Sequence, residues 1–159
     1  MIKQGDSIPS VTLAQATEDG PQPITTDEIF RGKTVVLFGV PGAFTPTCSA
    51  RHLPGFVEQA EALRAKGVDT IACIAVNDAF VMQAWKRDQK VGDTILMLAD
   101  GSADFTRAAG LELDLQARGL GTRSQRFALI AKNGKVMHVA VEEGGSFDVS
   151  SAEKVLAAL

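Results

Sequence analysis

The chain has 159 residues, of which 45% are hydrophobic and 22% are charged. These proportions are typical of a soluble globular protein, so we expect one domain over residues 1–159 and exclude disordered and collagen-like chains. The 16 basic and 19 acidic residues give a net charge of −3, and without a basic stripe we expect no nucleic-acid partner. The first residues lack the apolar core of a signal peptide and no apolar stretch could span a bilayer, so we expect a cytoplasmic protein without a membrane partner.

Apolar runs and helix-forming segments alternate along the chain. The expected strands are residues 11–13, 34–40, 69–76, 95–98, 124–131 and 135–141. Residues 18–23 are expected to form a turn around Gly20-Pro21. The expected helices are residues 46–66, 79–89, 103–109 and 150–159. We expect a kink at Pro54, because proline removes a helical hydrogen bond.

The order of these elements predicts a fold class. Strands that are each followed by a helix favour a parallel sheet. The last two strands are joined by Asn133-Gly134, a strong signal for an antiparallel hairpin. We therefore predict an α/β protein with the thioredoxin-like fold, a mixed central sheet with helices on both faces. Such a fold does not by itself fix a function.

The chain has two cysteines, Cys48 and Cys73, which allow at most one internal disulfide. A chain of the reducing cytosol usually keeps its cysteines as thiols. Cys73 lies in the apolar run 70–76, where burial makes a thiol unreactive, so we interpret it as a core residue.

Cys48 has a different setting, at the end of the loop that follows the first buried strand. Loops at the carboxyl ends of strands are where α/β folds bind ligands. Thr45 suits the N-cap of the next helix and Pro46 suits its first position, which places Cys48 in the first turn. Helix N-termini favour the thiolate, which is the nucleophilic form of cysteine. The alternative is that Cys48 is a small buried hydrophobic residue.

Residues 41–56, Pro-Gly-Ala-Phe-Thr-Pro-Thr-Cys-Ser-Ala-Arg-His-Leu-Pro-Gly-Phe, resemble the active-site segment of the peroxiredoxins of the type-5 (type II) subfamily. The pattern Pro-x-x-x-Thr-x-x-Cys is met by Pro41, Thr45 and Cys48. Residues 77–85 resemble the next helix of that subfamily, and residues 121–129 resemble its arginine-bearing strand.

The resemblance implies a thiol peroxidase that reduces hydrogen peroxide and organic hydroperoxides. Cys48 is then the peroxidatic cysteine, which becomes a sulfenic acid. Arg126 favours the thiolate and stabilises charge on the peroxide oxygens. Thr45 orients the peroxide through its hydroxyl group, and Pro41 shields the sulfur from water.

Each of these residues also has a purely structural interpretation. Thr45 could only cap the helix, Pro41 could only shape a turn, and Arg126 could only form a surface ion pair. Arg123 lies three residues before Arg126, so a regular strand would turn the two to opposite faces, and we expect Arg123 at the strand entrance or an interface.

Two further features bear on metals and assembly. The chain has no Cys-x-x-Cys pair and His138 has no neighbouring ligand in sequence, so we expect no metal and no cofactor. His52 is expected at the pocket rim or at a dimer interface. The subfamily often forms homodimers through the face of the active-site loop, where Phe44 and Phe80 are candidates.

Some members of the subfamily resolve the oxidised cysteine with a second cysteine near the C-terminus, but residues 142–149 contain none. We therefore expect recycling by glutathione with glutaredoxin. The alternatives are recycling by thioredoxin, a peroxide sensor or relay that oxidises a partner protein, and a catalytically silent binding module. Cys73 could replace the missing cysteine only if its strand moved, because a disulfide needs Cα atoms within about 7 Å.

Overall fold

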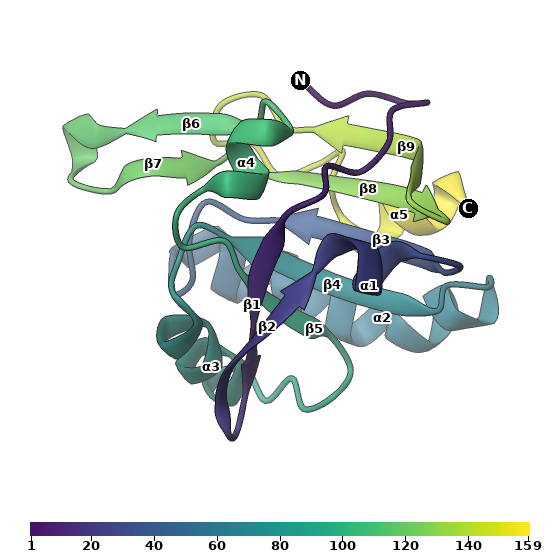
Figure 1. The fold of residues 1–159 in the computed structure, drawn as a ribbon, viewed down its shortest axis with the longest axis horizontal. Helices are drawn as coiled ribbons and strands as arrows, with labels where there is room; N and C mark the ends of the chain where they lie inside the picture. The colour runs from purple at the N-terminus through teal and green to yellow at the C-terminus, as the bar shows by residue number, and fades with distance from the viewer.

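The computed structural model describes residues 1–159 and contains a seven-stranded sheet in the order β2-β1-β5-β4-β3-β8-β9 (Figure 1). Its strands are β1 (Thr12–Thr17), β2 (Gly20–Thr25), β3 (Thr34–Gly39), β4 (Thr70–Ala75), β5 (Leu96–Ala99), β8 (Phe127–Lys132) and β9 (Lys135–Val141). Strand β4 pairs in parallel with β3 and with β5. Every other pair of neighbouring strands in this sheet is antiparallel. The sheet is mixed, as the order of elements predicts.

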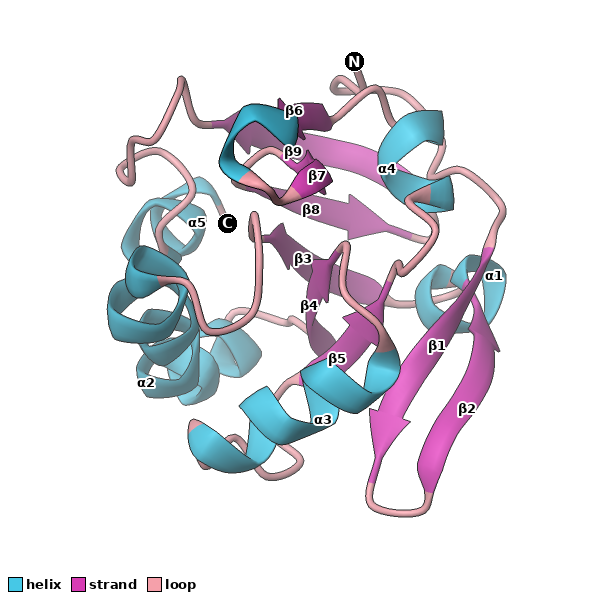
Figure 2. Ribbon diagram, turned by 90° about the vertical axis from the view of Figure 1, so that its left-hand side faces the viewer, coloured by secondary structure: helices cyan, strands magenta, loops and turns pink.

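Helices cover both faces of the sheet (Figure 2). Two hydrophobic clusters show the division. One packs α2 (Leu53–Ala65), α3 (Ala79–Asp88) and α5 (Ala152–Ala158) against one face. The other packs α1 (Thr26–Phe30) and α4 (Asp104–Ala108) against the opposite face. None of the helices is both long enough and apolar enough to cross a membrane.

Strand β3 is buried on both faces, and its residues explain why. Val36 and Phe38 point into the cluster with α2, whereas Val35 and Leu37 point into the cluster with α1. This alternation is what a central parallel strand needs, since both of its faces are covered by helices.

The hairpin at Asn133-Gly134 forms as predicted. Asn133 has a φ of 49° and Gly134 a φ of 78°, and a two-residue turn with positive φ at both positions matches the twist of the paired strands. Strands β8 and β9 pair on either side of it.

Two predicted segments, 18–23 and 124–131, differ from the structure. Residues 18–23 were expected to be a turn, but Gly20 begins strand β2, which pairs with β1 along its whole length. Prolines at 21 and 23 are tolerated there because β2 is an edge strand. The expected strand 124–131 is interrupted after β7 (Gly121–Ser124), which pairs with β6 (Glu112–Leu115) in a separate two-stranded sheet around the short helix η2 (Gln116–Arg118).

The pairing of β3 with β8 positions the candidate site. Gly39, the last residue of β3, lies opposite Phe127, the first residue of β8. Arg126, the residue just before β8, therefore lies beside the loop that follows β3 and leads to Cys48.

Candidate functional site

The loop between β3 and Cys48 is held by short hydrogen bonds. The Thr45 hydroxyl donates to the carbonyl oxygen of Gly42 at 2.7 Å, and the Ala43 amide donates to Asn77 Oδ1 at 2.9 Å. A Cβ atom at Gly42 would lie 2.9 Å from the Arg123 guanidinium. The loop therefore has little freedom, and a side chain at position 42 would displace the end of the Arg123 side chain that packs against it.

Cys48 begins a π-helical turn, η1 (Cys48–His52), which continues directly into α2. The Leu53 amide donates to the Cys48 carbonyl oxygen, a spacing of five residues. Such turns are rare and often lie at functional sites. Pro54, where we predicted a kink, is at the start of α2, so the irregularity lies in the turn just before the proline.

The sequence places Thr45 at the N-cap, and the Ser49 amide does donate to the Thr45 carbonyl oxygen at 3.0 Å. The Thr45 side chain, however, bonds to Gly42 and caps no helical amide. The hydroxyl oxygen therefore keeps lone pairs that can accept a further hydrogen bond.

Arg126 is the residue that meets the sulfur. Its Nη2 atom donates to Cys48 Sγ at 3.2 Å, although the two residues are 78 positions apart. Arg126 is only 7% exposed and takes part in none of the ion pairs of the structure. The buried guanidinium therefore places a positive charge directly beside the Cys48 sulfur.

His52 orients this guanidinium from the other side. Its Nδ1 atom lies 2.9 Å from Arg126 Nη1, and its Nε2 atom lies 3.0 Å from the Ser150 carbonyl oxygen. Arg126 can only donate and a carbonyl can only accept, so the bonds assign a neutral ring with its proton on Nε2. Burial, reinforced by the charge of Arg126, lowers the pKa of His52 to about 3.

The expected place of His52, at a rim or an interface, is therefore wrong. The ring is fully buried and packs between Phe38, Phe56 and Phe147. A spacing of four residues from Cys48 indicated proximity but not burial.

Glu142 anchors the segment that carries Ser150. Its Oε2 atom accepts from the Asp148 amide at 2.7 Å, the Ser150 amide at 2.9 Å and the Ser150 hydroxyl at 2.7 Å. Burial alone would raise the pKa of Glu142, but these hydrogen bonds to the carboxylate outweigh it and lower the pKa. The Glu142 amide also donates to the Arg126 carbonyl oxygen at 2.9 Å. Sequence reasoning missed Glu142 and Ser150, because no local motif marks them.

Arg123 has a role that the sequence did not indicate. Its Nη1 atom donates to the Val76 carbonyl oxygen at 3.3 Å and to the Pro41 carbonyl oxygen at 3.5 Å. It therefore supports the back of the loop from strand β7. The argument from strand alternation does not apply, because the strand is interrupted between Arg123 and Arg126.

Cys73 lies in the middle of β4, between Phe38 of β3 and Met97 of β5. It is fully buried and its thiol is free. Burial raises the pKa of Cys73 well above its usual value, so this thiol stays protonated. No group of three or more His, Cys, Asp or Glu side chains is arranged to hold a metal ion.

Comparison with known proteins places this geometry in a family. The model of the Redoxin family matches residues 3–156. Peroxiredoxin-2C of Oryza sativa subsp. japonica is 53% identical over 99% of this chain and 98% of its own. The crystal structure of reduced Prx3 in complex with H2O2 from Vibrio vulnificus is 55% identical and superimposes with a TM-score of 0.94 over 99% of both chains. The chain belongs to the peroxiredoxin family.

As a peroxiredoxin it is a thiol peroxidase with the thioredoxin-like fold, as its sequence predicts. The similar proteins include the hybrid peroxiredoxin hyPrx5 of Haemophilus influenzae, 41% identical over 96% of this chain and 64% of its own. They also include peroxiredoxin 5 from Alvinella pompejana, 35% identical with a TM-score of 0.88 over 99% of this chain and 97% of its own. These relatives agree with the resemblance to the type-5 subfamily.

Proposed function

We propose that Cys48 is the peroxidatic cysteine and that the enzyme reduces hydrogen peroxide and organic hydroperoxides. The observation that carries this is the contact of the Arg126 guanidinium with Cys48 Sγ at 3.2 Å. The thiolate attacks the terminal peroxide oxygen and forms an S–O bond as the O–O bond breaks. Cys48 becomes a sulfenic acid, and the other oxygen takes a proton and leaves as water or an alcohol.

The surrounding residues have roles that follow from their contacts. Arg126 stabilises the negative charge that develops on the leaving oxygen. Thr45, whose hydroxyl proton is engaged by Gly42, accepts a hydrogen bond from the hydroperoxide and orients it. The resemblance to the family assigns Pro41 to shielding the sulfur from water, and Arg123 donates to the Pro41 carbonyl oxygen. The relative from Vibrio vulnificus, whose structure is a complex with H2O2, supports this substrate.

We further propose that glutathione, with glutaredoxin, reduces the sulfenic acid. The support is the absence of cysteine from residues 142–149 together with the raised pKa of the buried Cys73. There are two competing proposals. In one, thioredoxin is the reductant; in the other, Cys48 passes its oxidation to a partner protein. Cytoplasmic localisation stays a prediction.

Two exposed aromatic side chains favour a homodimer as the working form. Phe44, in the loop before Cys48, is 51% exposed, and Phe80, at the start of α3, is 72% exposed. Large exposed apolar side chains often mark an interface. Sedimentation of the reduced protein would measure the assembly, and a monomer at all concentrations would contradict it.

The test of the function is a turnover assay with hydrogen peroxide. We expect many equivalents of peroxide to be consumed with glutathione and glutaredoxin, and fewer with thioredoxin and its reductase. A single equivalent of oxidation without turnover would instead identify a sensor. Mass spectrometry of the peroxide-treated protein with glutathione should find the adduct on Cys48, whereas a quantitative Cys48–Cys73 disulfide would contradict the recycling scheme.

A further inference from the structure

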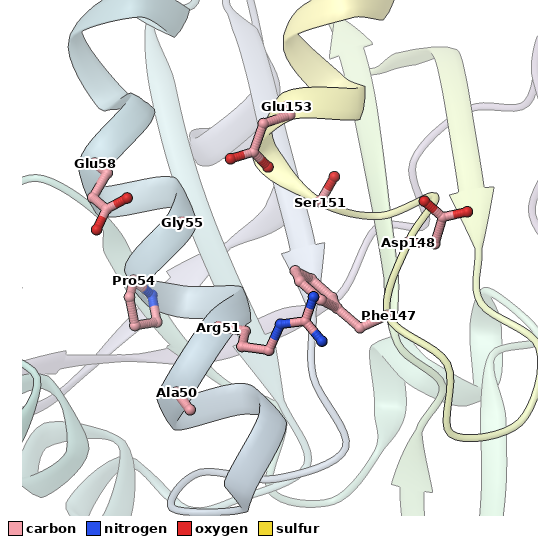
Figure 3. A pocket seen from close by; sticks show the side chains of 9 residues that line it. All are labelled: Ala50, Arg51, Pro54, Gly55, Glu58, Phe147, Asp148, Ser151 and Glu153. Atoms are coloured by element: carbon pink, nitrogen blue, oxygen red, sulfur yellow. The ribbon is translucent and has the colours of Figure 1, made fainter.

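A pocket of about 460 Å³ opens beside the π-helical turn of Cys48 (Figure 3). It lies between the start of the active-site helix and the segment that joins β9 to α5. Its volume is within the range of about 300–1,000 Å³ that is usual for small-molecule sites. The peroxide chemistry described above does not use it.

The pocket is lined by one basic side chain, Arg51, and by three acidic ones, Glu58, Asp148 and Glu153. Arg51 extends across it, with its guanidinium carbon 4.6 Å from the centre of the Phe147 ring. Arg51 is exposed and takes part in none of the ion pairs. Glu58 on α2 and Glu153 on α5 carry exposed carboxylates on the two helices that flank the pocket (Figure 3). A ligand that has both a carboxylate and an ammonium group would match this arrangement.

Phe147, and behind it Arg126, connect this pocket with the reacting sulfur. The Phe147 ring lies 5.1 Å from the His52 ring and 5.9 Å from the guanidinium carbon of Arg126, which contacts Cys48. Arg51 belongs to the same π-helical turn as Cys48. A molecule held by Arg51 is therefore next to the turn that carries the oxidised cysteine.

We propose that this pocket binds glutathione during recycling, an inference that rests on the proposed reductant. One carboxylate of the tripeptide pairs with Arg51, and its ammonium group pairs with Glu58 or Glu153. Phe147, which lines the pocket, belongs to the segment 142–149. This segment contains no cysteine that could compete with an external thiol for the oxidised Cys48.

The reaction at this site balances as a thiol exchange. The glutathione thiol gives up its proton and attacks the sulfenic sulfur of Cys48, so that an S–S bond forms as the S–O bond breaks, and the departing hydroxide takes up that proton and leaves as water. A second glutathione attacks the sulfur of the bound glutathione, which releases glutathione disulfide and returns the Cys48 thiolate. Because Cys48 has no exposed surface, its turn must open for the first step.

The test compares a charged thiol with an uncharged one. We would measure kcat/KM for glutathione and for dithiothreitol with hydrogen peroxide as oxidant, in the wild type and in Arg51→Ala. We expect the ratio of glutathione to dithiothreitol to fall about fivefold, because dithiothreitol has no carboxylate to pair. Arg51→Lys should recover part of the ratio. The matched control is Lys66→Ala, which removes an exposed positive charge at the far end of the same helix and should leave the ratio as in the wild type.

The outcomes separate the two proposals. If the wild type turns over with glutathione but Arg51→Ala keeps the wild-type ratio, the pocket assignment is overturned and the reductant stands. If glutathione does not reduce the wild type, the proposed reductant fails and this inference fails with it. Melting curves of both variants show whether the fold is intact, which we expect because both side chains are exposed.

Discussion

Cys48 and Cys73 occupy two regions of the same core, and both are fully buried free thiols. Cys73 lies within strand β4, where its neighbours across the sheet are Phe38 and Met97. Cys48 lies where a loop turns into a helix, with the Arg126 guanidinium 3.2 Å from its sulfur. Burial is equal at the two sites, so it cannot by itself distinguish the proposed peroxidatic cysteine from the cysteine in β4.

The difference between the two thiols is the charge beside them. An apolar strand disfavours the charged form, which is why the pKa of Cys73 is raised. At Cys48 a buried guanidinium without a carboxylate partner lies directly beside the sulfur. Arg126 is in turn held by His52, whose ring is fixed by the segment that Glu142 anchors. We therefore attribute the proposed reactivity of Cys48 to this series of contacts.

The largest effect should come from replacing each of the two cysteines separately. Cys48→Ser should abolish peroxide consumption, because the hydroxyl of serine is not a nucleophile under these conditions. Cys73→Ala should keep turnover with glutathione and cost about 1 kcal/mol of unfolding free energy for the small cavity. A peroxide-consumption assay and denaturant melts measure both. Loss of turnover in a folded Cys73→Ala variant would contradict the comparison.

The next effect concerns the charge itself. Arg126→Gln should lower the second-order rate constant with hydrogen peroxide roughly 100- to 1,000-fold, the usual loss when a donor to a developing oxyanion is removed. The thiol should also alkylate more slowly with iodoacetamide near neutral pH, because the positive charge beside the sulfur is removed. Arg126→Lys should recover part of both rates, because lysine keeps the charge without the planar geometry. An unchanged alkylation rate would show that Arg126 does not act on the sulfur.

The sequence predicts the elements whose signals are local. Strand β3 and the Asn133-Gly134 turn can be predicted from the sequence, because the apolar run and the turn residues that determine them are neighbours in the chain. Strand β2 was missed because Gly20, Pro21 and Pro23 are typical of turns, and only its edge position lets them pair.

The supporting part of the candidate site could not be predicted for a different reason. The contacts of His52 with Ser150 and Arg126 span 98 and 74 residues, and no periodicity or spacing encodes such distances. Arg126 itself was found only through the resemblance to a family, because an isolated arginine is usually an exposed residue. Local sequence therefore marks Cys48 as the candidate nucleophile, while the groups that position Arg126 beside it are brought together only by the tertiary fold.

A smaller effect should appear in the dependence of stability on pH. The pKa of His52 is about 3 in the folded protein against its usual 6.5, so between these values the unfolded chain binds a proton that the folded protein does not. Stability is therefore lost as the pH falls below 6.5, by about 2 kcal/mol between pH 7 and pH 5. Glu142 adds to the loss only near and below its usual 4.5.

Urea melts of the wild type and His52→Gln at pH 7 and pH 5 isolate this contribution. Glutamine does not titrate, so the variant should lose less stability over this interval than the wild type. Equal losses in the two proteins would mean that His52 is protonated in the folded state and does not accept a hydrogen bond from Arg126.

The smallest effect tests whether His52 positions Arg126 or only fills space. His52→Ala removes the acceptor for Arg126 Nη1 and the donor to Ser150, so the guanidinium is free to move away from the sulfur. We expect about a tenfold lower rate constant with hydrogen peroxide, less than for loss of the charge itself, because misplacement weakens an interaction without deleting it. His52→Gln can accept through Oε1 and donate through Nε2, and should recover most of the rate, whereas His52→Leu fills the volume without either bond. If leucine restores the rate as well as glutamine does, the ring contributes packing alone, and the difference between Cys48 and Cys73 rests on Arg126 without its support.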